Sequence, residues 1–317
     1  MSKVSVCLTT YNRKNNVLFA IENILNQTYK NIQLIIVDDC SIDGSQKIIS
    51  EKIKEIDQIE VLFIRNTVNK GLASSRNIAI NSSTGKFFTF CDDDDSWASN
   101  FIQEFVEISE KYNEDWCFTC CNSYLKNNKL KFRLSNYSDT IKNLIYKGFT
   151  PPVASQFYFV SSLKKVNGYN EKIKSGVDHD LWIRLSSIGM KVLNIGLTLS
   201  YPNIKNDNGR MTKNKFKRIN GINNALHEWR PQISELYGED FYCFFKMNYQ
   251  FYLHKTFFVQ AAKKFDFSTA FISLSKLKLY FIFLHIIKLV KKKIYPKKLY
   301  PNFFTYYKNP NEQFNKH

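Results

Sequence analysis

The stretch Lys86-Phe87-Phe88-Thr89-Phe90-Cys91 runs directly into four consecutive carboxylates, Asp92-Asp93-Asp94-Asp95. The apolar run is typical of a buried strand, and the acidic run marks the point where that strand ends. Four adjacent like charges destabilise one another unless a cation or a hydrogen-bonding ligand offsets them. Because alternate side chains of an extended chain share a face, Asp92 and Asp94 are predicted to point one way and Asp93 the other.

The acidic run has two compatible interpretations. Mg²⁺ binds hard oxygen ligands, usually one or two carboxylates, and leaves its other positions to waters and substrate phosphates. The first interpretation is therefore a site for Mg²⁺ or Mn²⁺ and a diphosphate, with Asp92 and Asp94 as the metal ligands. The second is a solvated acidic turn, in which Asp95 or Ser96 caps a helix that begins near Trp97.

Strand and helix patterns alternate on both sides of this stretch. Strands are predicted at residues 3–9, 32–37, 59–64 and 86–91, and helices at 15–27, 44–56, 72–82 and 177–189. The alternation predicts an α/β fold in which a mostly parallel sheet carries helices on both faces.

Polar clusters follow three of the predicted strands. They are Thr9-Thr10-Tyr11-Asn12-Arg13, Asp38-Asp39-Cys40-Ser41 and Asp92-Asp93-Asp94-Asp95. Ligands of parallel α/β sheets bind at the carboxyl ends of the strands, so a shared position there favours one site built from all three clusters. The alternative is chance, since loops are polar in any protein.

The composition indicates a folded chain, with 317 residues and 44% hydrophobic residues. Its seven cysteines are odd in number and lie mostly in apolar runs, which favours buried thiols in a reducing compartment. Met1-Ser2-Lys3-Val4 leads straight into a strand, and no stretch of 18 uncharged apolar residues occurs. We therefore expect a cytoplasmic protein without a signal peptide or a spanning helix.

The net charge of +17 is concentrated in the last third of the chain. Residues 201–317 hold 21 Lys and Arg against 7 Asp and Glu, a net of +14, which leaves +3 for residues 1–200. Such a basic region indicates an anionic partner, either a membrane or a nucleic acid. Within it, Ile272 to Ile294 is a basic amphipathic helix that fits an anionic membrane surface or, equally, packs on the rest of the protein.

Four segments, in this order, resemble glycosyltransferase family 2, whose members bind nucleotide sugars on a Rossmann-like GT-A fold. They are Val6-Cys7-Leu8-Thr9-Thr10-Tyr11-Asn12, Ile36-Val37-Asp38-Asp39-Cys40-Ser41, Asn69-Lys70-Gly71-Leu72-Ala73-Ser74-Ser75-Arg76-Asn77 and Phe90-Cys91-Asp92-Asp93-Asp94. The resemblance covers residues 1–200. It implies a catalytic domain at 1–205, with a nucleotide-sugar half at about 1–112 and an acceptor half at about 113–205, followed by a helical basic region at 206–317.

The resemblance also implies which residues hold the nucleoside. Thr9 and Tyr11 would flank a uracil, with the Tyr11 ring packed on the base and Arg13 in the same loop. Asp39 would accept hydrogen bonds from the uracil edge. The other interpretation of Tyr11 is ordinary loop packing.

A second group of residues would hold the diphosphate and the sugar. By resemblance, Lys70 or Arg76 lies near the diphosphate, Asp92 meets the ribose or sugar hydroxyls, and Asp94 holds the metal. A second register of the family pairs Asp93 rather than Asp92 with Asp94. The other interpretation of Arg76 is a charge on the surface of a helix.

The segment Ser175 to Leu185 resembles the family's Glu-Asp-x-Asp-Leu-Trp-x-Arg-Leu motif, with Val177 where Glu is common. The match implies Asp178 as the base that takes the acceptor's proton, with Asp180 in reserve. Alternatively, Asp178 caps the helix that follows it. One carboxylate base without a sugar–enzyme intermediate implies inversion at the anomeric carbon.

Taken together, the residues predict an inverting glycosyltransferase that uses Mg²⁺ or Mn²⁺ and a UDP-sugar carrying glucose, galactose or an N-acetyl form. Its acceptor would be a cell-surface glycan or glycolipid precursor, such as lipopolysaccharide, capsule or a lipid-linked oligosaccharide. It would work in the cytoplasm, attached to the inner face of the cytoplasmic membrane. Two other hypotheses stand: a nucleic-acid-binding protein, which the acidic loops disfavour, and a catalytically silent relative, which Val177 keeps open.

Overall fold

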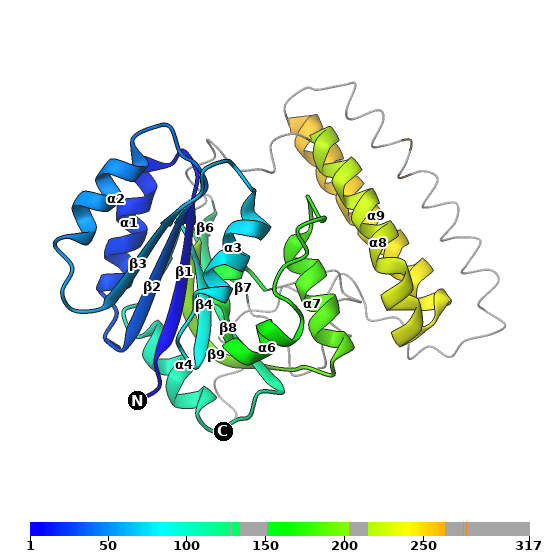
Figure 1. Ribbon diagram of the computed structural model, residues 1–317. Coiled ribbons are helices and arrows are strands. Elements are labelled where there is room, and N and C mark those ends of the chain that lie inside the picture. The colour runs from blue at the N-terminus through cyan, green and yellow to red at the C-terminus, as the bar shows by residue number, and fades with distance from the viewer. Residues whose placement is uncertain (127–128, 134–150, 203–214, 264–274, 276, 278–317) are drawn as a thin grey trace. The chain divides into compact units, whose positions relative to one another are not determined.

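Figure 1 shows the computed structural model, which describes residues 1–126, 129–133, 151–202, 215–263, 275 and 277. The chain divides into two compact units, Met1–Tyr242 and Cys243–His317. The boundary expected near residue 205 falls in the stretch 203–214, outside the described residues, as does most of the basic helix predicted at 272–294. None of the described helices is long and apolar enough to cross a membrane.

One mixed sheet organises the first unit. Its strands are β1 (Val4–Thr10), β2 (Ile32–Asp38), β3 (Glu60–Arg65), β4 (Phe87–Asp92), β5 (Asp95–Trp97), β6 (Trp116–Lys126), β7 (Lys129–Arg133), β8 (Gln156–Phe159) and β9 (Lys191–Pro202). The strand order is β3-β2-β1-β4-β8-β6-β9-β5, with β7 paired to β6. The neighbours from β3 to β4 are parallel, whereas β8 joins both β4 and β6 in antiparallel fashion. The α/β fold class is confirmed, and the predicted parallel sheet corresponds to those first four strands.

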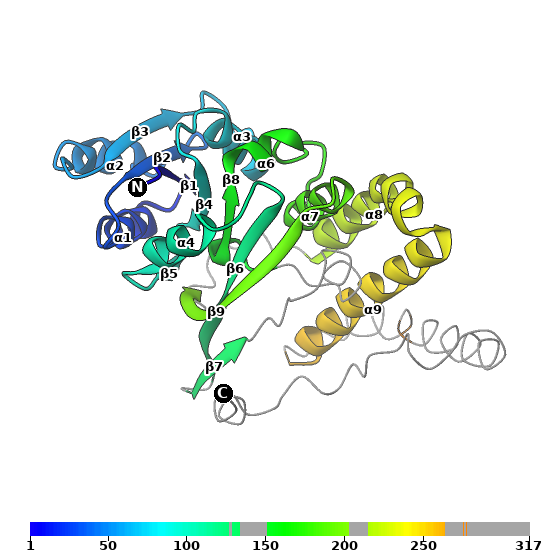
Figure 2. The same ribbon diagram turned by 90° about the horizontal axis from the view of Figure 1, so that it is seen from below.

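Helices cover both faces of these parallel strands. The helices of the described residues are α1 (Lys14–Leu25), α2 (Ser45–Ile53), α3 (Leu72–Asn81), α4 (Phe101–Ser109), α6 (Val160–Lys165), α7 (Val177–Ser187), α8 (Lys215–Tyr237) and α9 (Glu239–Lys263), with a 3-10 turn at Val153–Ser155. Five of them cover the parallel strands. Figures 1 and 2 show α1, α2 and α4 on one face and α3 and α6 on the other.

The core between β1 and α1 follows from the two periodicities of the sequence. Val4, Val6 and Leu8 alternate along β1 and are fully buried on the face that α1 covers. Val17 and Ile24 lie seven residues apart, on one side of α1, and pack into the same cluster. Burying each aliphatic side chain of this kind contributes about 1.5–3 kcal/mol.

Strand register brings the predicted site residues together at one edge of the sheet. Thr9 pairs with Asp92 across β1 and β4, and Thr10 pairs with Asp38 across β1 and β2. Since all these strands run in the same direction, the loops that follow them share the carboxyl edge. The position predicted for the three polar clusters is therefore the position that the fold gives them.

The predicted helix start at Trp97 is wrong. Asp95–Trp97 is a short strand, β5, which pairs with β9, and α4 begins at Phe101 after Asn100. Trp97 is fixed by distant partners: its indole Nε1–H donates to the carbonyl of Ala154 at 2.7 Å. Neither Asp95 nor Ser96 therefore caps a helix, and the acidic run is a turn between two strands.

We expect Gly85→Ala to destabilise the fold, because Gly85 lies where β1 and β4 begin to pair. An added Cβ would lie 2.7 Å from the Ser5 nitrogen, 2.8 Å from the Lys3 oxygen and 2.9 Å from the Phe87 oxygen. All three are backbone atoms, so relief requires the strands to move, and the free energy of unfolding should fall by about 1–3 kcal/mol. Urea unfolding followed by circular dichroism measures the change.

Gly189→Ala serves as the control for this prediction. Gly189 has φ +74° and no atom within 4 Å of an added Cβ, so alanine there adds only the cost of a left-handed backbone, about 1–2 kcal/mol. A Gly85→Ala variant as stable as the wild-type protein would contradict the close approach of the two strands.

Candidate active site

The loops that follow β1 and β2 are tied to each other. The backbone N–H of Asn12 donates to Ser41 Oγ, and Asn12 Oδ1 accepts from the backbone N–H of Ile42, both at 2.8 Å. Asn12 has φ 53°, a left-handed conformation that asparagine tolerates better than most residues. The neighbouring Tyr11 is 46% exposed, so loop packing leaves much of its ring available to a planar ligand. Thr9, the penultimate residue of β1, is half-buried.

Asp39 organises the loop that leads into α3. Its Oδ1 accepts hydrogen bonds from Asn66 Nδ2 and the Lys70 backbone N–H, and its Oδ2 accepts from the Gly71 backbone N–H, all at 2.8 Å. A carboxylate has about four lone-pair directions, so Oδ2 retains capacity for a further donor such as a uracil N–H. The Lys70 side chain is exposed above this loop. Nothing in the sequence indicates that Asp39 also binds the backbone of the loop before α3.

The acidic turn separates into two groups of carboxylates. Oxygens of Asp92, Asp94 and Asp95 lie within 4.8 Å of one another. Asp93 is buried on the other side, where it accepts hydrogen bonds from Thr10 Oγ1 at 3.1 Å and Arg13 Nη1 at 2.7 Å. The predicted division between Asp92 with Asp94 and Asp93 alone therefore matches the geometry, with Asp95 added to the first group.

Burial raises the pKa of Asp93 to about 7, although the Arg13 guanidinium opposes this shift. Arg13 also lies 3.3 Å from Asp94, so one cation braces two of the four carboxylates. Arg13 thus helps to hold the acidic turn in place together with Thr10, whatever it contributes to a ligand.

The carboxylate cluster fits a divalent cation. Asp92, Asp94 and Asp95 offer three hard oxygen ligands, and two of the three residues are only half-buried, which leaves room for water or a phosphate oxygen. Three carboxylates within 4.8 Å also repel one another, and a cation relieves that repulsion. Mg²⁺ and Mn²⁺ are the ions that such oxygen-only donors suit.

Arg76, on α3, is the centre of the site. Its guanidinium is 2% exposed and forms ion pairs in two directions, from Nη2 to Asp92 Oδ1 and from Nη1 to Asp178 Oδ1, each at 2.9 Å. The rings of Phe90 and Tyr169 flank it, with centroids 5.3 Å and 5.2 Å from Cζ. The surface-charge interpretation of Arg76 is therefore wrong, since the side chain is buried and connects two parts of the site.

Asp178 lies in the first turn of α7, facing Arg76. The helix is preceded by Gly176 in a left-handed conformation, with no side-chain capping bond, so Asp178 does not act as the N-cap. Tyr169 Oη donates to Asp178 Oδ1 at 3.3 Å, and the Asp178 side chain remains 29% exposed. Withdrawal from bulk water raises the pKa of Asp178, and Arg76 opposes the rise. The arrangement gives an accessible carboxylate that is more basic than an ordinary aspartate.

Asp180, the reserve candidate for the base, is already fully engaged. It is 2% exposed, and its Oδ2 lies 2.8 Å from Arg184 Nε and 2.7 Å from Arg184 Nη2. Its Oδ1 accepts a hydrogen bond from the indole Nε1–H of Trp229 at 3.0 Å. A carboxylate with both oxygens held in the core cannot reach an acceptor hydroxyl, so the geometry supports Asp178 alone.

Three contributors to the site were missed from the sequence. Tyr169 and Trp229 were not singled out, and Thr10 was named only as one of a polar cluster. The Asn-Gly pair before Tyr169 is the local signal of a turn, because Asn167 and Gly168 both have positive φ. Nothing in a single sequence indicates that Tyr169 faces an arginine 93 residues earlier.

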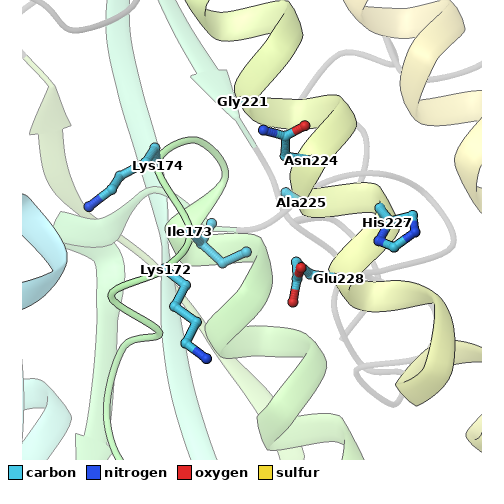
Figure 3. Close-up of a pocket in the computed structure, with 8 residues that line it drawn as sticks. All are labelled: Lys172, Ile173, Lys174, Gly221, Asn224, Ala225, His227 and Glu228. Atoms are coloured by element: carbon cyan, nitrogen blue, oxygen red, sulfur yellow. The ribbon is translucent and has the colours of Figure 1, made fainter.

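A separate polar pocket of about 260 Å³ lies between the loop before α7 and helix α8 (Figure 3). The loop contributes Lys172, Ile173 and Lys174, and α8 contributes Gly221, Asn224, Ala225, His227 and Glu228. Figure 3 shows Asn224 between the two elements, whereas Lys174 extends away from α8. The pocket shares no residue with the cluster around Arg76, but its loop leads directly into the turn that carries Asp178.

We expect Arg76→Met to destabilise the protein in a pH-dependent way. The variant keeps an unbranched side chain but leaves Asp92 and Asp178 without their shared cation. The free energy of unfolding at pH 7.5 should fall by roughly 2–4 kcal/mol, less than for a fully buried pair because both carboxylates are about a third exposed. Urea unfolding at several pH values measures this.

The sign of the pH effect follows from Asp178. Burial already raises the pKa of Asp178 in the wild-type protein, and loss of Arg76 should raise it further. The stability that Arg76→Met loses relative to the wild-type protein should therefore grow as pH rises from the wild-type pKa of Asp178 toward the higher pKa of the variant. At low pH, where the carboxyl is protonated in both proteins, the deficit should shrink. A deficit that is the same at pH 5 and pH 7.5 would indicate lost packing rather than lost charge.

Comparisons with known proteins agree with this geometry. The model of glycosyl transferase family 2 matches residues 5–167, just over half of the chain. Among curated relatives, the Escherichia coli UDP-Glc:alpha-D-GlcNAc-diphosphoundecaprenol beta-1,3-glucosyltransferase WfaP is 29% identical over 240 residues, which cover 71% of this chain and 86% of that enzyme. Other relatives are much longer, and the chain spans 30% or 31% of the length of three uncharacterised Rickettsia glycosyltransferases.

Solved structures with the same fold include TarS from S. aureus and a mannosyltransferase. Residues 1–349 of TarS, in complex with UDP-GlcNAc, align with a TM-score of 0.66 at 16% identity, over 88% of this chain and 81% of that crystallised chain. The mannosyltransferase PcManGT from Pyrobaculum calidifontis, in complex with GDP-Man and Mn²⁺, aligns with a TM-score of 0.58 at 15% identity, over 92% of this chain and 81% of that one. The GT-A fold expected from the sequence is thereby confirmed, and the chain belongs to glycosyl transferase family 2.

Proposed function

We propose that this glycosyltransferase transfers a hexose from a UDP-sugar, with inversion at the anomeric carbon, to a lipid-linked precursor of a cell-surface glycan. The observation that carries the proposal is the pairing of Asp92 and Asp178 with the two ends of one guanidinium, that of Arg76. A donor-side carboxylate and a carboxylate base are thereby held on either side of a single buried cation.

The donor side supports a uridine nucleotide. The exposed ring of Tyr11 offers a surface for a base, and Asp39 Oδ2 retains capacity for an N–H donor. WfaP is named for UDP-Glc, and TarS was solved with UDP-GlcNAc. Because WfaP is similar over most of its length, we take UDP-glucose as the first donor to test.

The chemistry assigns distinct tasks to the residues around Arg76. Asp178 takes the proton from the acceptor hydroxyl as that oxygen attacks the anomeric carbon. Arg76 fixes the orientation of Asp178 and limits the rise of its pKa, which favours the ionised carboxylate that a base requires. A divalent cation bound by Asp92, Asp94 and Asp95 would stabilise the charge of the departing diphosphate.

The stereochemistry follows from having one base. Of the two candidate carboxylates in α7, Asp178 faces the site while Asp180 is bound by Arg184 and Trp229. One displacement without a covalent sugar–enzyme intermediate inverts the anomeric carbon, so an α-linked UDP-glucose gives a β-linked product. WfaP is named as a beta-1,3-glucosyltransferase, which agrees with inversion.

The proposed acceptor is a sugar on a lipid diphosphate. WfaP is named for an acceptor of this kind, GlcNAc-diphosphoundecaprenol. Residues 201–317 carry a net charge of +14, which supports attachment to an anionic membrane surface where such a lipid resides. We infer that the acceptor approaches on the side of the Lys172–Lys174 loop, whose pocket adjoins the segment leading to Asp178 (Figure 3).

Donor and metal binding can be tested together by calorimetry. We expect UDP-glucose to bind in the presence of Mn²⁺ and to bind at least roughly tenfold more weakly after chelation, because a cation held by the carboxylate cluster would offset the charge of the diphosphate. Asp94→Asn should abolish this metal dependence. UDP-galactose, the UDP-linked N-acetyl sugars and GDP-glucose, titrated in parallel, identify the preferred sugar and base.

Asp93→Asn is the matched control for the metal experiment. Asp93 faces Thr10 and Arg13 rather than the carboxylate cluster, and with a pKa raised to about 7 it is partly protonated at neutral pH. We therefore expect its amide variant to retain metal-dependent binding. Loss of that dependence in Asp93→Asn as well as in Asp94→Asn would favour the alternative register of the acidic motif, in which Asp93 pairs with Asp94.

Asp178→Asn tests the base. Turnover of UDP-glucose with a GlcNAc-diphospholipid acceptor should fall roughly 100-fold or more, the usual contribution of a positioned base, while UDP binding measured by calorimetry stays within twofold. Product formation is followed with a radiolabelled donor, as label transferred to the acceptor. Wild-type turnover in the variant would remove the base assignment, and no turnover in the wild-type protein with any UDP-sugar would favour the catalytically silent relative.

A further inference from the structure

The segment that carries Asp178 lies directly against helix α8. We call Gly221, Ile222 and Trp229 the α8 face, because these three residues meet the segment 175–180. A Cβ added at Gly221 would lie 2.5 Å from Ser175 Oγ and 2.8 Å from Ser175 Cβ. The absence of a side chain at Gly221 is therefore what allows α8 to approach this loop so closely.

A second glycine, Gly176 in the loop before α7, allows the same close approach between this loop and the α8 face. Gly176 precedes α7 with φ +80°, and a Cβ added there would lie 3.0 Å from the Trp229 ring and 3.2 Å from Ile222 Cδ1. Trp229 and Ile222 are buried, with exposed fractions of 0% and 2%. The backbone immediately before Asp178 thus rests on two large apolar side chains of the α8 face.

Trp229 also holds the residues that follow Asp178. Its indole Nε1–H donates to Asp180 Oδ1 at 3.0 Å, and its ring lies near that of His179, with centroids 6.4 Å apart and 29° between the planes. Trp229 therefore contacts residues on both sides of Asp178.

The same network reaches the turn that carries Tyr169. Arg184 binds Asp180 through Oδ2 and donates from Nη1 to the carbonyls of Val166 and Gly168. Asp180 is thus fixed between Trp229 on one oxygen and Arg184 on the other. This arrangement explains why Asp180, only two residues from Asp178, is buried and has no access to a substrate.

We propose that Trp229 is a positioning residue, which holds the first turn of α7 through Gly176 and Asp180 so that Asp178 meets Arg76. The inference rests on the proposed role of Asp178. It assigns a task in the reaction to α8, which lies beyond the residues 5–167 that match the family model. Small displacements of a base matter, since a shift of about 1 Å can lower a rate about 100-fold.

Trp229→Phe is the first test, because it removes the indole N–H and retains an aromatic ring. With UDP-glucose and a GlcNAc-diphospholipid, we expect kcat to fall roughly tenfold while KM for the donor and UDP affinity stay within twofold. The donor residues lie on β1, β2, β4 and α3, whereas Trp229 lies on α8. A kcat within twofold of wild type would overturn the proposal.

Tyr242→Phe is the matched control. It removes a buried hydrogen bond of similar length, from Tyr242 Oη to the carbonyl of Leu226 on α8 at 2.9 Å, away from the segment 175–180. We expect its kcat to equal that of the wild-type enzyme. An equal loss of kcat in Tyr242→Phe and Trp229→Phe would show a general effect of α8 on folding and would overturn the positioning role.

Gly221→Ala tests the same contact without removing any interaction. Alanine favours a helix more than glycine does, which offsets part of the cost of the close contact, so the variant should remain folded while its Cβ displaces Ser175 and the turn beyond it. We expect kcat to fall at least roughly fivefold with donor KM unchanged. Ser175→Gly in the Gly221→Ala background makes room for the methyl group and should restore most of the lost activity. Unchanged kcat in Gly221→Ala, or no recovery in the double variant, would contradict the inference.

A double-mutant comparison shows whether Trp229 acts through Asp178. If it does, Trp229→Phe should lower the residual rate of Asp178→Asn no further, because no base remains to be positioned. A further tenfold loss in the double variant would instead indicate a separate role and overturn the proposal. Wild-type turnover in Asp178→Asn would overturn both this inference and the proposed base, whereas an inactive Asp178→Asn with a fully active Trp229→Phe would overturn only this inference.

Discussion

The site depends on one buried cation, the guanidinium of Arg76. Removing an arginine from water costs several kcal/mol unless partners replace its hydration. Here two carboxylates, Asp92 and Asp178, each lie 2.9 Å from it, and the rings of Phe90 and Tyr169 flank it. Since these partners come from β4, α7 and a connecting turn, the cation can be satisfied only when β4 and α7 are both in place.

The depth of Arg76 is in turn set by the start of its helix. Asp39, at the end of β2, accepts the backbone N–H groups of Lys70 and Gly71 and so fixes where α3 begins. Arg76 follows five residues later, about 7.5 Å along the helix axis at 1.5 Å per residue. The hydrogen bonds that Asp39 accepts from this loop therefore determine where the guanidinium of Arg76 lies. They couple the loop after β2 to the part of the site that carries Asp178.

The sequence predicted the elements well where their pattern is local. The helix expected at 15–27 is observed at Lys14–Leu25, and the strand expected at 86–91 at Phe87–Asp92, because apolar spacing alone specifies each of them. It failed at Asp95–Trp97, whose strand conformation depends on β9, about a hundred residues further along the chain. Local propensity carries no information about such a distant partner.

The same distinction separates the site residues. Asp92, Asp94 and Asp178 could be proposed from motifs, since the segments that carry them resemble those of glycosyltransferase family 2. The burial of Arg76 could not, because Asp178 lies 102 residues away from it in sequence. Asp180 was a plausible base by type and spacing, and only the positions of Arg184 and Trp229 reveal that it is a structural anion.

The proximity of Arg76 and Asp178 resolves an apparent conflict in what a base requires. A fully solvated aspartate has a pKa near 4 and is a weak base at neutral pH, whereas one buried without a cation becomes protonated and cannot accept a proton. Asp178 is partly buried, which raises its pKa, and it is paired with Arg76, which limits the rise. The opposing effects leave a carboxylate that is more basic than in water, and a base is most effective when its pKa lies near the working pH. The buried cation therefore organises the site and also tunes the basicity of the residue that it holds.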